Sequence, residues 1–195
     1  MSVDQATLSV YRDRVEDYKK LVQEIKNPDL DYFLKCLPNG GCVLDAGAGP
    51  GLDAAILKEY GFDVIALEPV DVFADLIEQR GVTTIRDNFD AITQVDKFDG
   101  IWAHFSLLHV SRDHLPILLA NFHKAMKQDG TFVIGMKLGE GSKRDKLGRL
   151  YTYYSTDELI ELLTSTGFAV FRKRTYRIVG LAGDKEPCIA LMANA

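Results

Sequence analysis

Short apolar runs alternate with longer amphipathic stretches along most of this chain. The runs have the length of buried strands, and the stretches have the apolar spacing of helices that pack one face against a sheet. The pattern predicts strands at Cys42–Asp45, Asp63–Glu68, Val82–Ile85, Phe98–Ala103 and Thr131–Met136. It predicts helices at Gln5–Gln23, Pro28–Leu37, Leu52–Glu59, Val72–Gln79 and His114–Lys127. A β–α alternation of this kind is typical of an α/β sandwich.

The C-terminal third follows a different pattern. Residues 128–130 (Gln-Asp-Gly) predict a turn before the fifth strand, and a capping signal at Thr156 opens a helix that runs to Leu163. Two further apolar segments, Phe168–Thr175 and Cys188–Ala193, predict a closing antiparallel pair. The chain has 195 residues, of which 47% are hydrophobic, and it contains no internal repeat. These features predict one compact domain.

A glycine-rich turn follows the first predicted strand. The strand ends at Asp45, glycine occupies positions 47, 49 and 51, and Leu52 begins the next helix. Glycine has no Cβ and tolerates positive φ, so such a turn lets a ligand touch the backbone, and the N–H groups of the helix start face the same spot. A strand, a glycine turn and a helix in this order hold nucleotide-like cofactors in doubly wound sheets. The alternative is a turn needed only for packing.

The spacing of the glycines and two acidic residues narrow the choice of cofactor. The dinucleotide fingerprint is G-x-G-x-x-G, and here Leu52 stands at the position of the third glycine. Asp45 lies two positions before the first glycine, where a carboxylate suits a cationic ligand. Glu68 ends the second predicted strand about 20 residues after the glycines, where an acid can accept both hydroxyls of a ribose, including that of NAD. The alternative for Glu68 is a cap on the next helix, but Pro69 follows it and Asp71 is the better N-cap candidate.

The segment from Asp45 to Gly51, with Glu68 at its spacing, resembles motif I and the ribose-binding acid of the class I S-adenosylmethionine (SAM) methyltransferases. Residues 87–89 (Asp-Asn-Phe) are similar to the Gly-Asp-Phe of that family. Asn88 stands in place of the acid that meets the adenine amino group, and an amide oxygen can accept the same hydrogen bond. A small-molecule branch of the family is also similar in the pair Tyr11 and Tyr18 and in residues 98–110, 139–145 and 148–154, so that the resemblance covers residues 11–195.

The resemblance implies a Rossmann-like, doubly wound, seven-stranded sheet with a C-terminal antiparallel hairpin, in an α/β/α sandwich. It implies that residues 1–40 form an N-terminal helical lid on a SAM-binding domain of residues 41–195. Tyr11 and Tyr18 are seven residues apart, two turns along one helical face, and their phenol groups are expected on the sulfonium side of SAM. The alternative is that both rings pack on the sheet. The implied contacts of SAM, or of its product S-adenosylhomocysteine (SAH), are Tyr11, Tyr18, Asp45, Ala46, Gly47, Ala48, Gly49, Gly51, Glu68, Pro69, Asn88, Phe89 and Ala103.

Two histidines after the fourth predicted strand are candidates for a general base. Histidine titrates near neutral pH, and methyl transfer needs a base only where the acceptor holds its proton tightly. His109 matches the resembling branch, whereas the position of His104 is commonly small there, and either ring can instead be a structural hydrogen-bonding group. The segment 138–154 is expected to contribute to the acceptor pocket, and its side chains suit a polar or anionic molecule or form a surface network. The predicted acceptor residues are Arg144, Arg149, Tyr151 and Tyr153.

Composition argues against several classes of protein. The net charge of −5 argues against a nucleic-acid partner, because the chain lacks a basic footprint. No apolar run is long enough to span a membrane and the N-terminus is no signal peptide, which predicts a cytoplasmic protein. Three cysteines without C-x-x-C spacing are expected to be reduced and buried, with no metal site: Cys36, Cys42 and Cys188.

The sequence therefore predicts a SAM-dependent methyltransferase that acts on a small-molecule acceptor by in-line displacement, as a monomer or homodimer. A nicotinamide-dependent oxidoreductase of the same broad fold is an alternative, against which Leu52 argues. A tRNA or rRNA methyltransferase is another, but the Asn/Asp-Pro-Pro-Tyr segment typical of exocyclic base methylation does not follow the fourth predicted strand. A SAM-binding regulatory domain without turnover stays open. The acceptor and its methylated atom are not fixed by the sequence.

Overall fold

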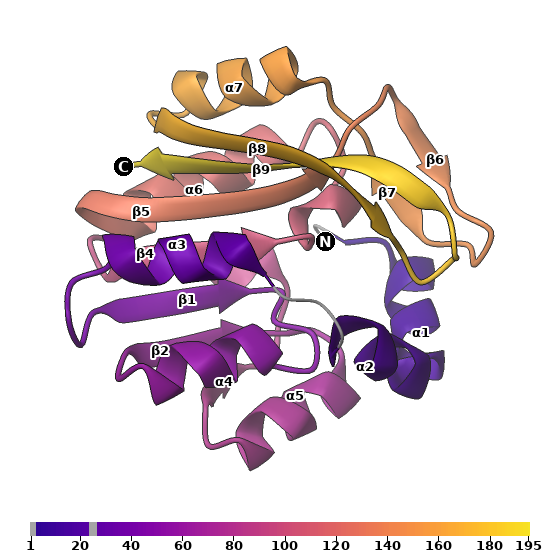
Figure 1. Cartoon of the computed structure of the whole chain (residues 1–195), viewed down its shortest axis with the longest axis horizontal. Coiled ribbons are helices and arrows are strands. Elements are labelled where there is room, and N and C mark those ends of the chain that lie inside the picture. Colours follow the sequence, from indigo (N-terminus) through magenta and orange to yellow (C-terminus); the bar gives the residue numbers. More distant parts are fainter. Residues whose placement is uncertain (1–2, 24–26) are drawn as a thin grey trace.

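The computed structural model describes residues 3–23 and 27–195. Within these residues, seven strands form one sheet in the order β3-β2-β1-β4-β5-β9-β8 (Figure 1). The first five strands of this order pair in parallel, and β9 and β8 close the sheet as an antiparallel hairpin. The predicted α/β fold class is therefore confirmed. The strands are β1 (Cys42–Ala46), β2 (Asp63–Leu67), β3 (Thr83–Ile85), β4 (Phe98–His104), β5 (Met126–Lys137), β8 (Ala169–Val179) and β9 (Lys185–Asn194).

Helices cover both faces of the sheet. One face packs against Phe33 of α3, Leu57 of α4 and Ile77 of α5. The other face packs against Phe122 of α6 and Leu163 of α7. The helices are α1 (Gln5–Asp13), α2 (Val15–Gln23), α3 (Pro28–Cys36), α4 (Leu52–Glu59), α5 (Asp71–Gln79), α6 (Leu115–Ala125) and α7 (Thr156–Ser165), with 3-10 turns η1 (Phe89–Ala91) and η2 (Leu107–His109). None of the helices in the described part of the chain has the length and apolar composition needed to cross a membrane.

The prediction of one helix over Gln5–Gln23 is wrong. Arg14 leaves helical geometry, with φ −117° and ψ 29°, and separates α1 from α2. Tyr11 and Tyr18 therefore lie on different helices, and the argument from one helical face does not hold. Their rings nevertheless meet edge to face, with centroids 5.1 Å apart, because the bend folds the two helices toward each other.

Further expectations about local structure need correction. Asp71 is the first residue of α5 rather than its N-cap, because Val70 holds the extended cap conformation. The predicted turn at residues 128–130 is a bend inside β5, where Asp129 has φ 63°, since the helix before it already ends at Ala125. Residues 138–154 carry a small hairpin of β6 (Ser142–Arg144) and β7 (Leu150–Thr152). Cys188 is buried as expected, but Cys36 and Cys42 are half-buried.

The parallel strands end at one edge of the sheet, and the functional residues gather there. Asp45 stands near the end of β1, Glu68 follows β2 and His104 ends β4. The first two helices, drawn in indigo, lie beside this edge, with the β6–β7 hairpin nearby (Figure 1). Open α/β sheets bind ligands outside the carboxyl ends of their strands.

Candidate active site

The glycine turn after β1 has the geometry that its sequence predicts. Gly47, Gly49 and Gly51 all have positive φ, at 79°, 54° and 75°. A Cβ added to Gly47 would lie 2.4 Å from Cβ of Ser106, so a larger residue does not fit. The amide of Gly47 donates to the carbonyl oxygen of Leu67 at 2.8 Å, which ties the turn to the end of β2. The backbone is thereby held close to any ligand above it.

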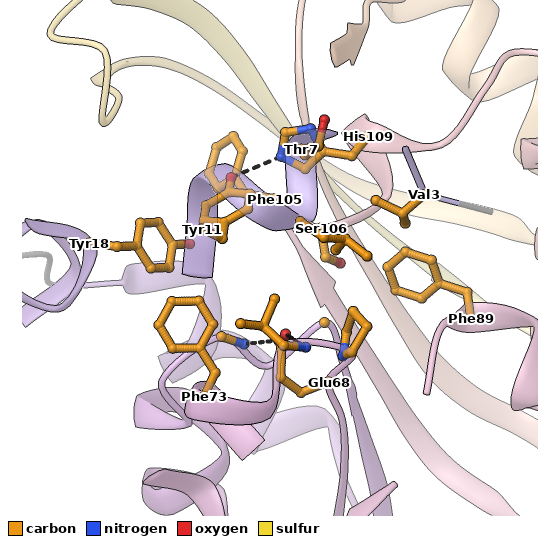
Figure 2. A pocket seen from close by; sticks show the side chains of 15 residues that line it. Val3, Thr7, Tyr11, Tyr18, Glu68, Phe73, Phe89, Phe105, Ser106 and His109 are labelled. Carbon is orange, nitrogen blue, oxygen red and sulfur yellow. Dashed lines mark hydrogen bonds between the residues drawn. The ribbon is translucent and has the colours of Figure 1, made fainter. Parts of the chain in front are cut away.

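Glu68 is buried beside this turn, and both its carboxylate oxygens accept backbone hydrogen bonds. Gly49 N donates to Oε2 and Val70 N donates to Oε1, each at 2.8 Å (Figure 2). Burial raises the pKa of Glu68 to about 7, although the two amides oppose the shift. A carboxylate held in this way has lone pairs left for a second donor, as a ribose hydroxyl would supply.

Two more carboxylates make the cleft acidic. Asp45 is 3% exposed, and among the described residues its Oδ2 finds no hydrogen-bond partner. Asp53 accepts from Nε1 of Trp102 at 2.9 Å. Burial raises the pKa of both acids, and the charges of Asp53 and Glu68 raise that of Asp45 further. An unpaired buried acid is costly, and a cationic ligand would supply the missing counter-charge.

Two cavities flank the glycine turn. The first, of about 470 Å³, runs under α1, and the second, of about 650 Å³, lies toward α3 and β8. Tyr18, Gly47 and Phe105 line both cavities, so the two meet there. The first is lined by Val3, Thr7, Leu8, Tyr11, Tyr18, Gly47, Gly49, Glu68, Pro69, Val70, Phe73, Phe89, Phe105, Ser106 and His109 (Figure 2), and the second by Tyr18, Val22, Asn27, Asp45, Gly47, Ala48, Pro50, Leu52, Asp53, Trp102, His104, Phe105 and Ile178.

The structure brings most of the predicted cofactor residues together at these cavities. Among the described residues, four of the predicted cofactor residues line neither cavity. Ala46 and Ala103 are buried within β1 and β4, and the carbonyl oxygen of Ala46 accepts from Ser106 Oγ at 2.5 Å. Gly51 is the N-cap of α4. Asn88 is the N-cap of η1 and accepts from Asp90 N at 3.0 Å. The residues on the linings are Tyr11, Tyr18, Asp45, Gly47, Ala48, Gly49, Glu68, Pro69 and Phe89.

His109 lies on the first cavity within a tight hydrogen-bonded cluster. Its Nδ1 donates to the carbonyl oxygen of Leu150 at 2.6 Å, which leaves Nε2 as an acceptor. The hydroxyl of Tyr11 lies 2.9 Å from Nε2 and donates to it. Arg149 Nη1 in turn donates to the Tyr11 oxygen at 3.0 Å, and Arg149 pairs with Asp145 at 2.7 Å. Burial lowers the pKa of His109 to about 3, so the ring is neutral.

His104 lies on the second cavity with different partners. Its Nδ1 is 3.3 Å from the side-chain nitrogen of Asn27, and its Nε2 is 3.2 Å from the hydroxyl oxygen of Tyr176. A carboxylate oxygen of Asp29 lies 4.0 Å from the same Nε2, and Asp29 accepts from Arg174 Nε at 2.8 Å. Burial lowers the pKa of His104 to about 4, with Asp29 opposing the shift. This ring is neutral as well.

The four predicted acceptor residues on segment 138–154 line neither cavity, among the residues that the structure describes. Arg144 is half-exposed and pairs with Asp4 just before α1, at 2.9 Å. Arg149 is buried and contacts α1 through Tyr11. The other two are the buried rings Tyr151, which packs against His109 with centroids 4.5 Å apart, and Tyr153, which donates to Glu186 at 2.9 Å.

Several site residues were missed by the sequence analysis. Phe105 lines both cavities and has φ 59°. Positive φ is rare for phenylalanine, and no local sequence pattern predicts it here. Trp102 reaches the site because alternate residues of β4 point to the same face. Asp53 did carry a signal, because an acid directly after a glycine turn faces whatever the turn holds. Phe73 and Asn27 come from segments whose approach depends on the tertiary fold.

Comparison with known proteins identifies the fold and the chemistry. The model of a family described as "Methyltransferase domain" matches residues 16–173, most of the chain. The chain is a class I SAM-dependent methyltransferase. No curated protein matches the sequence of this methyltransferase.

Solved structures share the fold at low sequence identity. A Burkholderia thailandensis 1,6-didemethyltoxoflavin-N1-methyltransferase with bound 1,6-didemethyltoxoflavin and SAH has a TM-score of 0.80 at 24% identity, over 97% of this chain and 87% of its own. A possible histamine N-methyltransferase from Thermotoga maritima has a TM-score of 0.69 at 18% identity, over 96% and 99%. Phosphoethanolamine N-methyltransferase 2 from Haemonchus contortus, in complex with SAM, has a TM-score of 0.74 at 14% identity, over 98% and 60%.

The residues of the site fit SAM as the methyl donor. SAM carries a cationic sulfonium and an ammonium, and the cleft offers the unpartnered oxygen of Asp45 with Asp53 and Glu68 nearby. Ser106 and Ile77 exclude a Cβ at Gly47 and Gly51, so packing requires glycine at both positions of the turn. A nicotinamide dinucleotide would instead bring two phosphate charges into this acidic site, an unfavourable pairing.

Proposed function

We propose that this methyltransferase transfers the methyl group of SAM to a small molecule at the junction of its two cavities. The observation that carries the proposal is the meeting of both cavities at Tyr18, Gly47 and Phe105, above an acidic glycine turn and under the first two helices. The two halves of a nucleotide-like donor need two adjoining spaces, and the methyl group leaves where these spaces meet. Holding the two in line and excluding water is most of what the protein has to supply.

The cofactor is proposed to span the junction. Glu68 faces the ribose, Pro69 and Phe89 border the adenine, and Asp45 faces the amino-acid end. Tyr18 lies against the turn, with a ring carbon 3.3 Å from a Cβ built on Gly49, and its ring face suits the sulfonium. When bound, SAM supplies a methyl group that its positive sulfur has already activated. The remaining predicted contacts are proposed to support the glycine turn and the loop after β3 without lining the cavities: Ala46, Gly51, Asn88 and Ala103.

A small acceptor suits the aromatic lining of the site. The rings of Tyr11, Tyr18 and Phe73 gather at one end of the first cavity, with Phe89 toward the other (Figure 2). This aromatic wall and the acidic floor offer little to a nucleic-acid backbone, which needs basic contacts. The Burkholderia enzyme, which holds a small molecule together with SAH, supports the same class of acceptor.

The predicted acceptor residues of segment 138–154 are proposed to act mainly through the lid. Arg144 and Arg149 reach α1 and the residue before it, through Asp4 and Tyr11. Tyr151 and Tyr153 pack behind them. Together they hold α1 over the site, so that the acceptor meets a closed cavity.

Calorimetric titration tests the cofactor assignment before any acceptor is known. We expect SAH to bind and NADH not to bind. Glu68→Ala should weaken SAH binding by about tenfold or more, because a hydrogen bond to a charged acceptor contributes roughly 1.5–3 kcal/mol. Glu161→Ala, at an exposed acid on α7, is the control with unchanged affinity. Binding of NADH without SAH would overturn the proposal.

A further inference from the structure

We propose that Asn27, held by His104, binds the carboxylate of the cofactor's amino-acid end in the second cavity, and that this contact makes the enzyme select cofactors that carry the carboxylate. The inference rests on the proposed function, because it assumes that SAM or SAH spans the junction with its amino-acid end toward Asp45. Asn27 is not among the cofactor contacts that the sequence predicts.

The amino-acid end of SAM carries two opposite charges on one carbon. Its ammonium requires acceptors, and its carboxylate requires donors. Acceptors are present at Asp45 and Asp53, which both line the second cavity, and among the described residues the Oδ2 of Asp45 has no hydrogen-bond partner. These acids repel a carboxylate, because like charges repel. The carboxylate therefore needs a donor on another part of the lining.

Asn27 supplies such a donor, and its orientation is fixed from two sides. It is the N-cap of α3, and its Oδ1 accepts from Asp29 N at 3.2 Å. The amide nitrogen therefore points the other way, to Nδ1 of His104 at 3.3 Å. Nδ2 has two hydrogens, and this contact uses one of them. Because Asn27 also lines the second cavity, the other hydrogen can serve a ligand there.

His104 holds the amide in place. Its Nδ1 accepts from Asn27, so that Nε2 carries the hydrogen and faces Tyr176 Oη at 3.2 Å. An added Cβ at Gly135 would lie 2.7 Å from His104 Cδ2, so glycine on β5 leaves the space that the ring occupies. The bond between Asn27 and His104 is long, and a charged carboxylate is a stronger acceptor than a neutral ring nitrogen, so the amide can tilt toward a ligand. His104 is a positioning residue in this arrangement, because it acts through Asn27.

The buried acid beside this donor is neutralised by a partner. Asp29 is fully buried, with Oδ2 4.0 Å from Nε2 of His104. It accepts from Nε of Arg174 at 2.8 Å and from a second nitrogen of the same guanidinium. A bidentate pair of this kind balances the charge of the acid. A ligand carboxylate at Asn27 therefore meets a balanced ion pair, whereas at Asp45 it would meet an acid without a counter-charge.

Two stacked rings bring a donor and an acid to neighbouring places on the lining. His104 stacks on Trp102, with ring centroids 4.9 Å apart. Trp102 Nε1 donates to Asp53 at 2.9 Å, and His104 contacts Asn27. All four residues line the second cavity. One ring thus holds an acceptor for the ammonium and the next ring holds a donor for the carboxylate, as two groups on one carbon require.

Decarboxylated SAH (S-adenosyl-3-thiopropylamine) isolates the contribution of the carboxylate, because it keeps the nucleoside, the sulfur and the ammonium. SAH and this amine are each titrated by calorimetry at neutral pH. We expect the wild type to bind SAH more tightly than the amine. Asn27→Ser keeps a capping oxygen but loses Nδ2, and it should reduce SAH affinity by about tenfold while the affinity for the amine changes less than about twofold. Asn39→Ser, the same substitution at an exposed residue in the turn before β1, is the control with an unchanged ratio of affinities.

The ratio of the two affinities also tests the role of His104. His104→Phe removes the acceptor that holds the amide and should lower the preference for SAH. His104→Gln offers a side-chain oxygen to Asn27 and should retain more of that preference. A merely structural defect would weaken the binding of both ligands alike. In the wild type, the imidazole nitrogen signals of His104 should shift further with SAH than with the amine.

The outcomes separate the two proposals. Absence of SAH binding in the wild type overturns the proposed function. SAH binding without preference over the amine, or a wild-type preference retained in Asn27→Ser, overturns the carboxylate contact. If Asn27→Ser does not fold, Asn27→Asp keeps the cap and places a negative charge at the contact, so it should bind the amine more tightly than SAH, and a retained preference for SAH overturns the contact. A wild-type preference in His104→Phe removes His104 from the proposal.

Discussion

His104, which ends β4, and His109, which follows it, show how surroundings, rather than residue type, assign a role. His109 is held at 2.6 Å by the carbonyl oxygen of Leu150 and at 2.9 Å by the hydroxyl of Tyr11. His104 makes longer contacts, at 3.3 Å and 3.2 Å. Both rings are neutral, with His109 buried and His104 largely buried. The short, charge-supported bonds tie His109 to the protein, whereas the longer bonds of His104 can be exchanged for bonds to a ligand.

The cluster around His109 extends into α1. The amide of Leu150 donates to Thr7 Oγ1 at 2.9 Å, and Asp4 accepts from Arg144 at 2.9 and 3.0 Å. These contacts join residues about 140 positions apart in the sequence. His109 is thereby part of the docking of α1 on the β6–β7 hairpin. The comparison predicts that substitutions in the His109 cluster lower the free energy of unfolding, whereas substitutions in the His104 cluster mainly change ligand binding.

The largest effect is expected from Arg149→Met. Removing one partner of a buried ion pair typically costs about 3–5 kcal/mol, and Arg149 is fully buried between Asp145 and Tyr11. Urea denaturation should therefore show a loss of about that size in the free energy of unfolding. Arg144→Met breaks a half-exposed pair with Asp4 and is the control, with a loss much smaller than that of Arg149→Met. Equal losses in the two variants would contradict the picture of a buried lid contact.

The two histidines and Glu68 should change the stability of the protein in opposite directions as pH falls. Burial lowers the pKa of His104 to about 4 and of His109 to about 3, from 6.5, so the folded state binds fewer protons than the unfolded state in that window. Their contribution to stability is present above about pH 6.5 and falls as pH falls toward 4. Glu68 acts in the opposite sense: its pKa rises from 4.5 to about 7, so its contribution is lost as pH rises through this range. A tenfold difference in proton affinity between the folded and unfolded states corresponds to about 1.4 kcal/mol of stability.

Urea denaturation between pH 4.5 and 7.5 measures these contributions. We expect His104→Phe and His109→Phe each to reduce the loss of stability on acidification, and Glu68→Gln to increase it. The readout is the slope of the free energy of unfolding against pH, because any of these substitutions can also change that free energy by the same amount at every pH. Slopes equal to that of the wild type in both histidine variants would mean that the buried rings do not titrate as described.

A matched pair of tyrosine variants sharpens the contrast between the clusters. Tyr11→Phe leaves Nε2 of the buried His109 without its donor and should cost about 1–3 kcal/mol. Tyr176→Phe removes a longer contact at 3.2 Å and should cost less, below about 1 kcal/mol. Thermal unfolding of both variants gives the comparison. If Tyr176→Phe lost more stability than Tyr11→Phe, the His104 cluster would be the rigid one and the His109 cluster the exchangeable one.

The sequence predicts the parts of this molecule that local patterns encode. The turn from Asp45 to Gly51 and the place of Glu68 follow from residue identity and spacing, because both lie directly after apolar strands. The break at Arg14 and the positive φ of Phe105 depend on packing against distant segments, which no local pattern contains. The ion pair of Arg174 with Asp29 joins residues 145 positions apart, and the β6–β7 hairpin rests on its contacts with α1. The sequence therefore predicts the glycine turn and its neighbouring acids more fully than the surroundings of the two histidines.

The smallest effect on the unliganded protein, and the most specific, is expected at Asn27. Asn27→Asp keeps an oxygen for the N-cap bond from Asp29 but turns a second oxygen, an acceptor, toward His104 Nδ1. The ring should then carry its proton on Nδ1, the reverse of the wild-type tautomer, and long-range nitrogen–proton NMR of the imidazole would detect the exchange. Asn27→Ser retains a capping oxygen without a group facing the ring and is the control. His109, fixed by Leu150 and Tyr11, should keep its tautomer in both variants. If His104 also kept its tautomer in Asn27→Asp, its environment would be as rigid as that of His109, and the distinction between the two rings would fail.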